Sequence, residues 1–326
     1  MTSPRLSVIV IAYDMAAQAL NTLKSLAPGY QNGIAADDYE VIVVENRSSH
    51  CMDAAAIAAL PGNFRYLLRE NDSVSPARAI NEALAEARGS MIGIMIDGAR
   101  MVTPGVLRFA LMAHQISPMA VVAVPGYQLG PEPQHVNTSR SFAQDIEALS
   151  SIDWPAKGYK LFSIASISQA NRTGFLTPFM ESNCLFAPTT LLRDMGGAEE
   201  RFDLPGGGAL NLYLYHKLVN HPETVYFVLP GEGSFHQVHG GVTTSARAGR
   251  EDFLAQILTQ LNTILGEPFK SPKCSPILLG TLPGPVHPFL KISTESFIKR
   301  TLRLERGIED PELSGQHQIF QDLHSR

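Results

Sequence analysis

"LSVIVIA", residues 6–12, is an almost continuous apolar run that is rich in β-branched residues. A strand that is buried on both faces of a sheet has this composition. Two further runs, "EVIVVE" (40–45) and "MIGIMI" (91–96), repeat the pattern. Three such strands in one chain predict a parallel sheet.

Helical patterns lie between these runs. The segment "AAQALNTLKSL" (16–26) places three leucines on one stripe, as an amphipathic helix does. The segment "SPARAINEALAEARG" (75–89) has Ser75 as its N-cap, Pro76 in its first turn and Gly89 just past its end. This alternation of strands and helices predicts an α/β fold with right-handed crossovers.

The composition excludes several classes of protein. A chain of 326 residues that is 44% hydrophobic and 17% charged is expected to be globular. Its net charge of -5 gives no basic field, so we expect no nucleic-acid partner. Its three cysteines are far apart and form no CxxC pair, which indicates a reducing compartment. With no signal-peptide pattern and no apolar stretch near the ~20 residues that span a bilayer, we expect a cytoplasmic protein.

Each of the three expected strands ends in polar residues. The first ends at Tyr13 and Asp14, the second at Glu45 and Asn46, and the third at Asp97. In an open parallel sheet, ligands bind outside the carboxyl ends of the strands. The chain has no GxGxxG fingerprint and no GxxxxGK[ST] phosphate loop. A metal ion held by Asp97 is then the simplest way to neutralise a bound diphosphate.

Five segments resemble, in order, the inverting glycosyltransferases of GT-A fold, family 2. They are spread over about 6–241 and read "LSVIVIAYDMAAQALNTLKSL", "YEVIVVENRSS", "AINEALAEARGSMIGIMIDGARMVTPGVL", "ESNCLFAPTTLLRDMGGAEERFDLPGGG" and "EGSFHQVHGG". The resemblance implies a Rossmann-like, mixed, mostly parallel sheet flanked by helices. It also implies a nucleotide diphosphate-sugar donor, with a UDP-sugar favoured, and a divalent cation, Mn²⁺ or Mg²⁺.

The resemblance also implies a division of the chain. A GT-A domain is expected over 1–245, with a nucleotide-sugar half at about 1–105 and an acceptor half at about 106–245. Residues 246–326 are expected to form a helical, Pro-rich C-terminal extension.

Carried over by position, the family pattern assigns residues to the donor. Ala12, Tyr13 and Asp14 would border the nucleoside, and Glu45 would stand where the family has an aspartate that reaches the base or ribose. The remaining residues expected at the nucleotide-sugar are Asn46, Arg78, Asn81, Asp97, Gly98, Ala99, Arg100 and Asn183.

The chain departs from the family at its acids. The second carboxylate of the Asp-x-Asp motif is replaced by Ala99. The family segment Gly-Gly-Glu-Asp-x-Asp-Leu, whose acid often serves as general base, reads "GGGALNL", with Gly208, Ala209 and Asn211 in place of the acids. Either the chemistry has moved to other side chains or it has been lost.

Other residues are candidates for the metal ligands and for the general base. His236 and His239 lie in a region that commonly completes the metal site in this fold, and a neutral imidazole suits Mn²⁺ beside carboxylate oxygens. The alternatives are loop histidines that pair with backbone, and metal-free binding in which Arg100 neutralises the phosphates directly. Glu181 is the first candidate for the general base and Asp203 the second, although a loop carboxylate also serves in caps or ion pairs.

These observations favour a glycosyltransferase that moves a sugar from a nucleotide diphosphate-sugar to a hydroxyl acceptor. The acceptor expected by family analogy is a glycan or lipid-linked glycan of cell-envelope polysaccharide synthesis. A basic amphipathic stretch at 297–306 allows at most peripheral membrane contact. The alternative is a non-catalytic nucleotide-sugar binding or scaffold protein whose GT-A site is degenerate.

Overall fold

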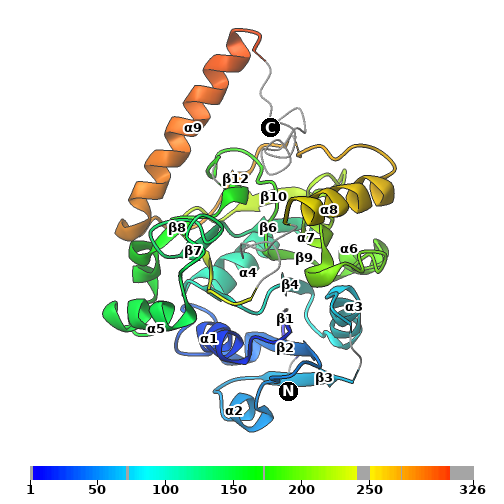
Figure 1. Ribbon diagram of the computed structural model, residues 1–326, viewed down its shortest axis with the longest axis vertical. Helices are drawn as coiled ribbons and strands as arrows, with labels where there is room; N and C mark the ends of the chain where they lie inside the picture. Colours follow the sequence, from blue (N-terminus) through cyan, green and yellow to red (C-terminus); the bar gives the residue numbers. More distant parts are fainter. Residues whose placement is uncertain (1–2, 71–72, 172, 241–249, 273, 309–326) are drawn as a thin grey trace.

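The computed structural model describes residues 3–70, 73–171, 173–240, 250–272 and 274–308. Helices flank a central mixed sheet, seen near the middle of Figure 1. From edge to edge this sheet runs β12 (Ile277–Leu278), β10 (Val225–Val228), β6 (Ala120–Ala123), β9 (Cys184–Pro188), β4 (Met91–Met95), β1 (Leu6–Ala12), β2 (Tyr39–Asn46) and β3 (Phe64–Arg69).

The three strands expected from the apolar runs are β1, β2 and β4, and they are neighbours. β1 lies between the other two and is parallel to both. Every residue of the three strands is buried, which explains why their sequences are apolar rather than alternating. The α/β class and the mostly parallel sheet are therefore confirmed. β9 is the exception, since it runs antiparallel between β4 and β6.

The helices divide between the two faces of the sheet. Residues of α1, α2 and α4 share one buried cluster with one face, and residues of α3, α6, α7 and α8 share a second cluster with the other face. The helices are α1 (Ala16–Leu26), α2 (Ala54–Ala58), α3 (Ala77–Glu86), α4 (Val106–Ile116), α5 (Phe142–Ser151), α6 (Thr189–Asp194), α7 (Leu210–Val219), α8 (Arg250–Leu265) and α9 (His287–Glu305). Short 3₁₀ turns occur at Ala36–Asp38, Gly158–Ile164, Gln169–Asn171, Pro205–Gly207 and Gly284–Val286.

The expected start of α3 is wrong by one residue. Pro76, not Ser75, occupies the N-cap position. The Ser75 hydroxyl donates to the Phe202 carbonyl oxygen at 2.5 Å, while it accepts a weaker bond of 3.3 Å from the Ala77 amide. A tertiary contact to a residue 127 positions away thus competes with the local cap.

A second, smaller sheet has the order β5 (Arg100–Val102), β11 (Ser234–His236), β7 (Gly126–Leu129) and β8 (Ala165–Ile167). β11 is antiparallel to β5 and parallel to β7, with His236 in register with Arg100 on one side and Gln128 on the other. This sheet therefore brings a histidine near the C-terminal end of the main-sheet strand β4.

The expected boundary at residue 245 lies outside the described residues. Beyond it, the described residues from 250 to 308 contribute both to the buried core and to the main sheet. α8 packs against the buried cluster, β12 extends the main sheet beside β10, and α9 leads away from the body in Figure 1. Among the helices of the described residues, none is long and apolar enough to cross a membrane.

Candidate active site

A cavity of about 540 Å³ lies at the carboxyl ends of β1, β2 and β4. Ten of the residues expected from the sequence line it: Ala12, Tyr13, Asp14, Asn46, Asp97, Arg100, Glu181, Asn183, His236 and His239. They come from both halves of the chain. The cavity is large enough for a small-molecule ligand.

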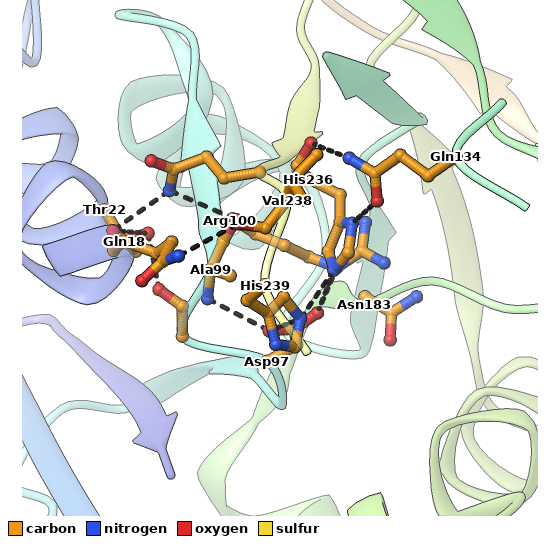
Figure 2. A network of polar contacts seen from close by, with 12 residues as sticks. Gln18, Thr22, Asp97, Ala99, Arg100, Gln134, Asn183, His236, Val238 and His239 are labelled. Carbon is orange, nitrogen blue, oxygen red and sulfur yellow. Dashed lines mark hydrogen bonds and ion pairs between the residues drawn. The ribbon is translucent and has the colours of Figure 1, made fainter. Parts of the chain in front are cut away.

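Asp97, His236 and His239 form a compact cluster in the cavity wall, and Figure 2 shows their side chains pointing toward one another. His236 Nε2 lies 3.0 Å from one oxygen of Asp97 and 2.9 Å from His239 Nε2. His239 Nε2 lies 3.7 Å from the other oxygen of Asp97. A carboxylate and two imidazoles thus present their ligand atoms to one small volume.

Burial and charge keep Asp97 and His236 in the forms that bind cations. Burial lowers the pKa of His236 to about 4, so this imidazole is neutral at pH 7. Burial by itself would raise the pKa of Asp97, but the interactions with His236 and His239 outweigh it and hold that pKa well below its usual range. An ionised carboxylate beside the neutral His236 imidazole is a donor set that suits a divalent metal ion.

The spacing of the cluster also fits a metal ion. Two ligand atoms that each lie about 2.1 Å from an ion, at a right angle, are about 3 Å apart. The distances from His236 Nε2 to Asp97 and to His239 are 3.0 and 2.9 Å. The residues present therefore fit a divalent ion, with nitrogen and oxygen ligands that suit Mn²⁺ better than Mg²⁺.

Arg100 supplies a positive charge to the same wall of the cavity. Its side chain is about 9% exposed, and its Nε lies 3.5 Å from the same Asp97 oxygen that faces His236. The guanidinium also lowers the pKa of Glu181, so its charge reaches a second carboxylate of the cavity. A cation in this wall of the cavity complements a diphosphate.

Glu181 is held in the cavity by amides. Asn183 Nδ2 donates to one carboxylate oxygen at 3.1 Å, and Asn211 Nδ2 donates to the other at 2.6 Å. Burial raises the pKa of Glu181, an effect that Arg100 and the two asparagines only partly offset. A carboxylate with a raised pKa in a cavity has the property of a general base.

Several predicted residues lie outside the cavity lining because they are used elsewhere. The Glu45 carboxylate turns away and accepts from the Met52 amide at 2.8 Å and from the Tyr66 hydroxyl at 2.6 Å. Adjacent residues of a strand face opposite ways, so Asn46 lines the cavity and Glu45 does not. The second candidate base, Asp203, is exposed and accepts from Gln260 at 2.8 Å.

Four other predicted residues also lie outside the cavity lining: two of them have polar partners elsewhere, and two are closely packed. Arg78 pairs with Glu200 at 3.1 Å, and Asn81 bonds to both the amide and the carbonyl of Ala198. Gly98 has no room for a side chain, because a Cβ would lie 2.8 Å from the Ile11 carbonyl oxygen. Ala99 is fully buried beneath the cluster.

Many residues that line the cavity were not predicted from the sequence. Leu212, Leu254, Ile257 and Met180 form an apolar part of the lining, and Gln128, His135, Ser168 and Gln169 form a polar part. Most of these residues belong to irregular or C-terminal segments, where a single sequence carries no strand-end signal.

The comparisons with known proteins agree with this geometry. Residues 7–158 match the model of glycosyl transferase family 2. The matched segment is a little under half of the chain. It includes β2, β4 and all but the first residue of β1, together with Asp97, but not Glu181 or the two histidines. No curated protein matches the chain at a significant level.

Solved structures share the fold of this chain. A fragment of S. aureus TarS, residues 1–349, is 14% identical, with a TM-score of 0.50 over 79% of this chain and 72% of that one. The same fragment in complex with UDP is 16% identical, with the same TM-score and coverage. Mannosyltransferase PcManGT from Pyrobaculum calidifontis, in complex with GDP-Man and Mn²⁺, is 15% identical over 96% of this chain and 78% of that one, with a TM-score of 0.44. That last likeness is too weak to carry an inference, whereas the TarS likeness shows a GT-A fold.

Proposed function

We propose that this chain transfers a sugar from a nucleotide diphosphate-sugar to a hydroxyl acceptor, with inversion at the anomeric carbon. The observation that carries the proposal is one cavity that holds three strand ends, the Asp97–His236–His239 cluster and Glu181. The family 2 match supports sugar transfer as the class of reaction.

The donor would lie along the carboxyl ends of β1, β2 and β4. Tyr13, Asp14 and Asn46 would border the nucleoside, and Arg100 would complement the diphosphate. A divalent ion held by Asp97, His236 and His239 would offset charge on the diphosphate as it leaves. UDP is the first nucleotide to test, since the TarS fragment of similar fold binds it.

Glu181 would act as the base. As the acceptor oxygen bonds to the anomeric carbon, the bond from that carbon to the diphosphate breaks and the acceptor proton passes to the Glu181 carboxylate. Asn183 and Asn211 would orient this carboxylate through their donated bonds. The acceptor would then occupy the side of the cavity near Leu212 and Leu254, which we propose takes a glycan or lipid-linked glycan in cytoplasmic assembly of envelope polysaccharide.

The donor site is tested by a thermal-shift screen with UDP, GDP, CDP and dTDP, each with and without Mn²⁺. We expect one nucleotide with Mn²⁺ to stabilise the wild type by about 2.7 kcal/mol at a concentration of 100 times its Kd. Asp97→Ala and His239→Ala should lose this stabilisation.

Two exposed residues, Asp37 and His287, provide matched controls for the donor test. Asp37→Ala and His287→Ala should keep the full shift. If a nucleotide without metal still raises the melting temperature of Asp97→Ala, the diphosphate is bound by Arg100 and not by a metal ion.

The base is tested by transfer and donor-hydrolysis assays on Glu181→Gln. Loss of a positioned base lowers kcat by about 10²–10⁴-fold, while the Kd for the donor should stay unchanged. Glu147→Gln, on the exposed side of α5, is the control. If Asp203→Asn abolishes turnover and Glu181→Gln does not, the base is Asp203.

A second candidate function is a nucleotide-sugar binding scaffold without catalysis. It is favoured by Ala99 and Asn211, which stand where the family has acids. Donor binding with no transfer or hydrolysis over a broad acceptor screen would establish it.

A further inference from the structure

The side chain of Gln134 holds His236 at two points. The Oε1 atom of Gln134 lies 2.7 Å from His236 Nδ1, and the Nε2 atom donates to the His236 carbonyl oxygen at 3.2 Å. Both residues are buried, with 5% of Gln134 and 2% of His236 exposed. Figure 2 shows the amide alongside the ring. Gln134 has no role in the proposed donor binding, metal binding or proton transfer.

The two-point contact fixes the orientation of the amide. A carbonyl oxygen accepts only, so the group that meets the His236 carbonyl is the Gln134 NH₂, and the group that meets Nδ1 is the Gln134 oxygen. Because that oxygen cannot donate, His236 Nδ1 carries the hydrogen. In the neutral ring, Nε2 then holds the lone pair.

The lone pair of His236 is thereby aimed at the cluster. Nε2 lies 3.0 Å from the Asp97 oxygen and 2.9 Å from His239 Nε2. With the hydrogen on Nδ1, the Nε2 lone pair and the carboxylate oxygen are two acceptors that face each other, and a cation between them satisfies both. In the opposite tautomer, Nε2 would present a hydrogen to this volume and could not bind an ion there.

Gln134 is itself held in place. Its backbone N–H donates to Gln128 Oε1 at 2.6 Å, and Gln128 lies in register with His236 where β7 pairs with β11. The glutamine and the histidine are 102 residues apart, yet both are tied to the same ladder. The amide is thus preorganised relative to the ring that it holds.

We propose that Gln134 is a positioning residue that selects the Nδ1–H tautomer of His236 and so aims Nε2 at a metal ion bound with Asp97 and His239. The metal part of this inference rests on the proposed function. The tautomer part does not, and the experiment separates the two.

The test compares wild type with Gln134→Met, which keeps the length of the side chain and removes the acceptor, and with Gln134→Glu, which keeps an acceptor for Nδ1–H. The first readout is ¹⁵N-detected NMR of the histidine tautomers without metal. The second is calorimetric titration with Mn²⁺ alone. Gln115→Met, at an exposed site on α4, is the control.

We expect His236 to be the Nδ1–H tautomer in wild type, Gln134→Glu and the control, and a mixture in Gln134→Met. The Mn²⁺ affinity of Gln134→Met should fall about 10- to 100-fold. An Nε2–H tautomer in wild type, or a folded Gln134→Met with unchanged tautomer and affinity, overturns the proposal. If Gln134→Met does not fold, the wild-type and Gln134→Glu tautomers decide it. If wild type binds no Mn²⁺, the metal site fails, while the NMR result still decides the role of Gln134.

Discussion

Asn211 shows how one residue changes the chemistry of a site without emptying it. It stands where the family has an acid, and it donates a 2.6 Å hydrogen bond to the Glu181 carboxylate. The carboxylate beside Asn211 is thus on a different segment, and the Asn211 amide stabilises its ionised form. The loss of a family acid is by itself weak support for loss of catalysis in this chain.

The hydrogen bond from Asn211 to Glu181 predicts that the pH dependence of kcat/KM shifts when Asn211 is replaced. The base must be ionised, so kcat/KM falls as the pH drops through the pKa of Glu181, which burial raises. Removing the Asn211 donor by Asn211→Leu should raise this pKa further and move the acidic limb of the kcat/KM profile to higher pH. The exposed Asn32 offers a control in Asn32→Leu, whose profile should match wild type. An acidic limb that stays in place in Asn211→Leu would assign the limb to another group.

At the scale of elements, the segment from β11 to His239 is held by residues that alternate with the two histidines. The Gln237 amide and side chain both donate to the Ala99 carbonyl oxygen, and the Val238 amide donates to the buried Asp145 carboxylate at 2.6 Å. Asp145 also accepts from Arg140 at 2.8 Å. Helix α5 thereby fixes the cluster from outside the cavity.

The contacts of Asp145 with Val238 and Arg140 predict that Asp145→Asn lowers the stability of the protein. The variant loses a charge-assisted bond with Arg140, so urea unfolding should show a decrease of roughly 1–3 kcal/mol in the free energy of unfolding. Mn²⁺ affinity should fall as well, since Val238 adjoins both histidines. Glu147→Gln, on the same helix, should change neither quantity. Unchanged stability would show that α5 does not hold this segment.

At the scale of the whole molecule, strand order ties the two halves together. β9, from residues 184–188, lies between β4 and β6, and its Phe186 packs against Gly93 of β4, where an added Cβ would lie 2.5 Å from the ring. The strands of the N-terminal segment are thus bordered at β4 by a strand from the second half of the chain. The expected division at about residue 105 stays a prediction about function.

The same order predicts that a fragment of residues 1–105 does not fold by itself. It would expose the edge of β4 and the faces that α4, α6 and α7 cover in the full chain. Its far-UV and near-UV circular dichroism should lack a cooperative thermal transition, in contrast to the full chain. A sigmoidal transition with native-like near-UV signal would show that this half is a domain of its own.

The sequence by itself determined β1, β2, β4, α1 and the edge at which ligands are expected. Burial on both faces requires an unbroken apolar run, and this requirement is local, so it is visible in a single chain. For the same reason the α/β class and the family 2 resemblance followed from short ordered segments, and both are confirmed.

Only the tertiary structure decided which polar residues meet. Glu45 and Asn46 are adjacent in sequence but face opposite ways, and Gln134 reaches a histidine 102 residues away. Strand pairing and side-chain direction set these contacts, and neither leaves a local pattern. The Glu181 carboxylate likewise reaches the cavity through the fold, since Glu181 and its partner Asn211 are 30 residues apart in sequence and are in contact in the structure.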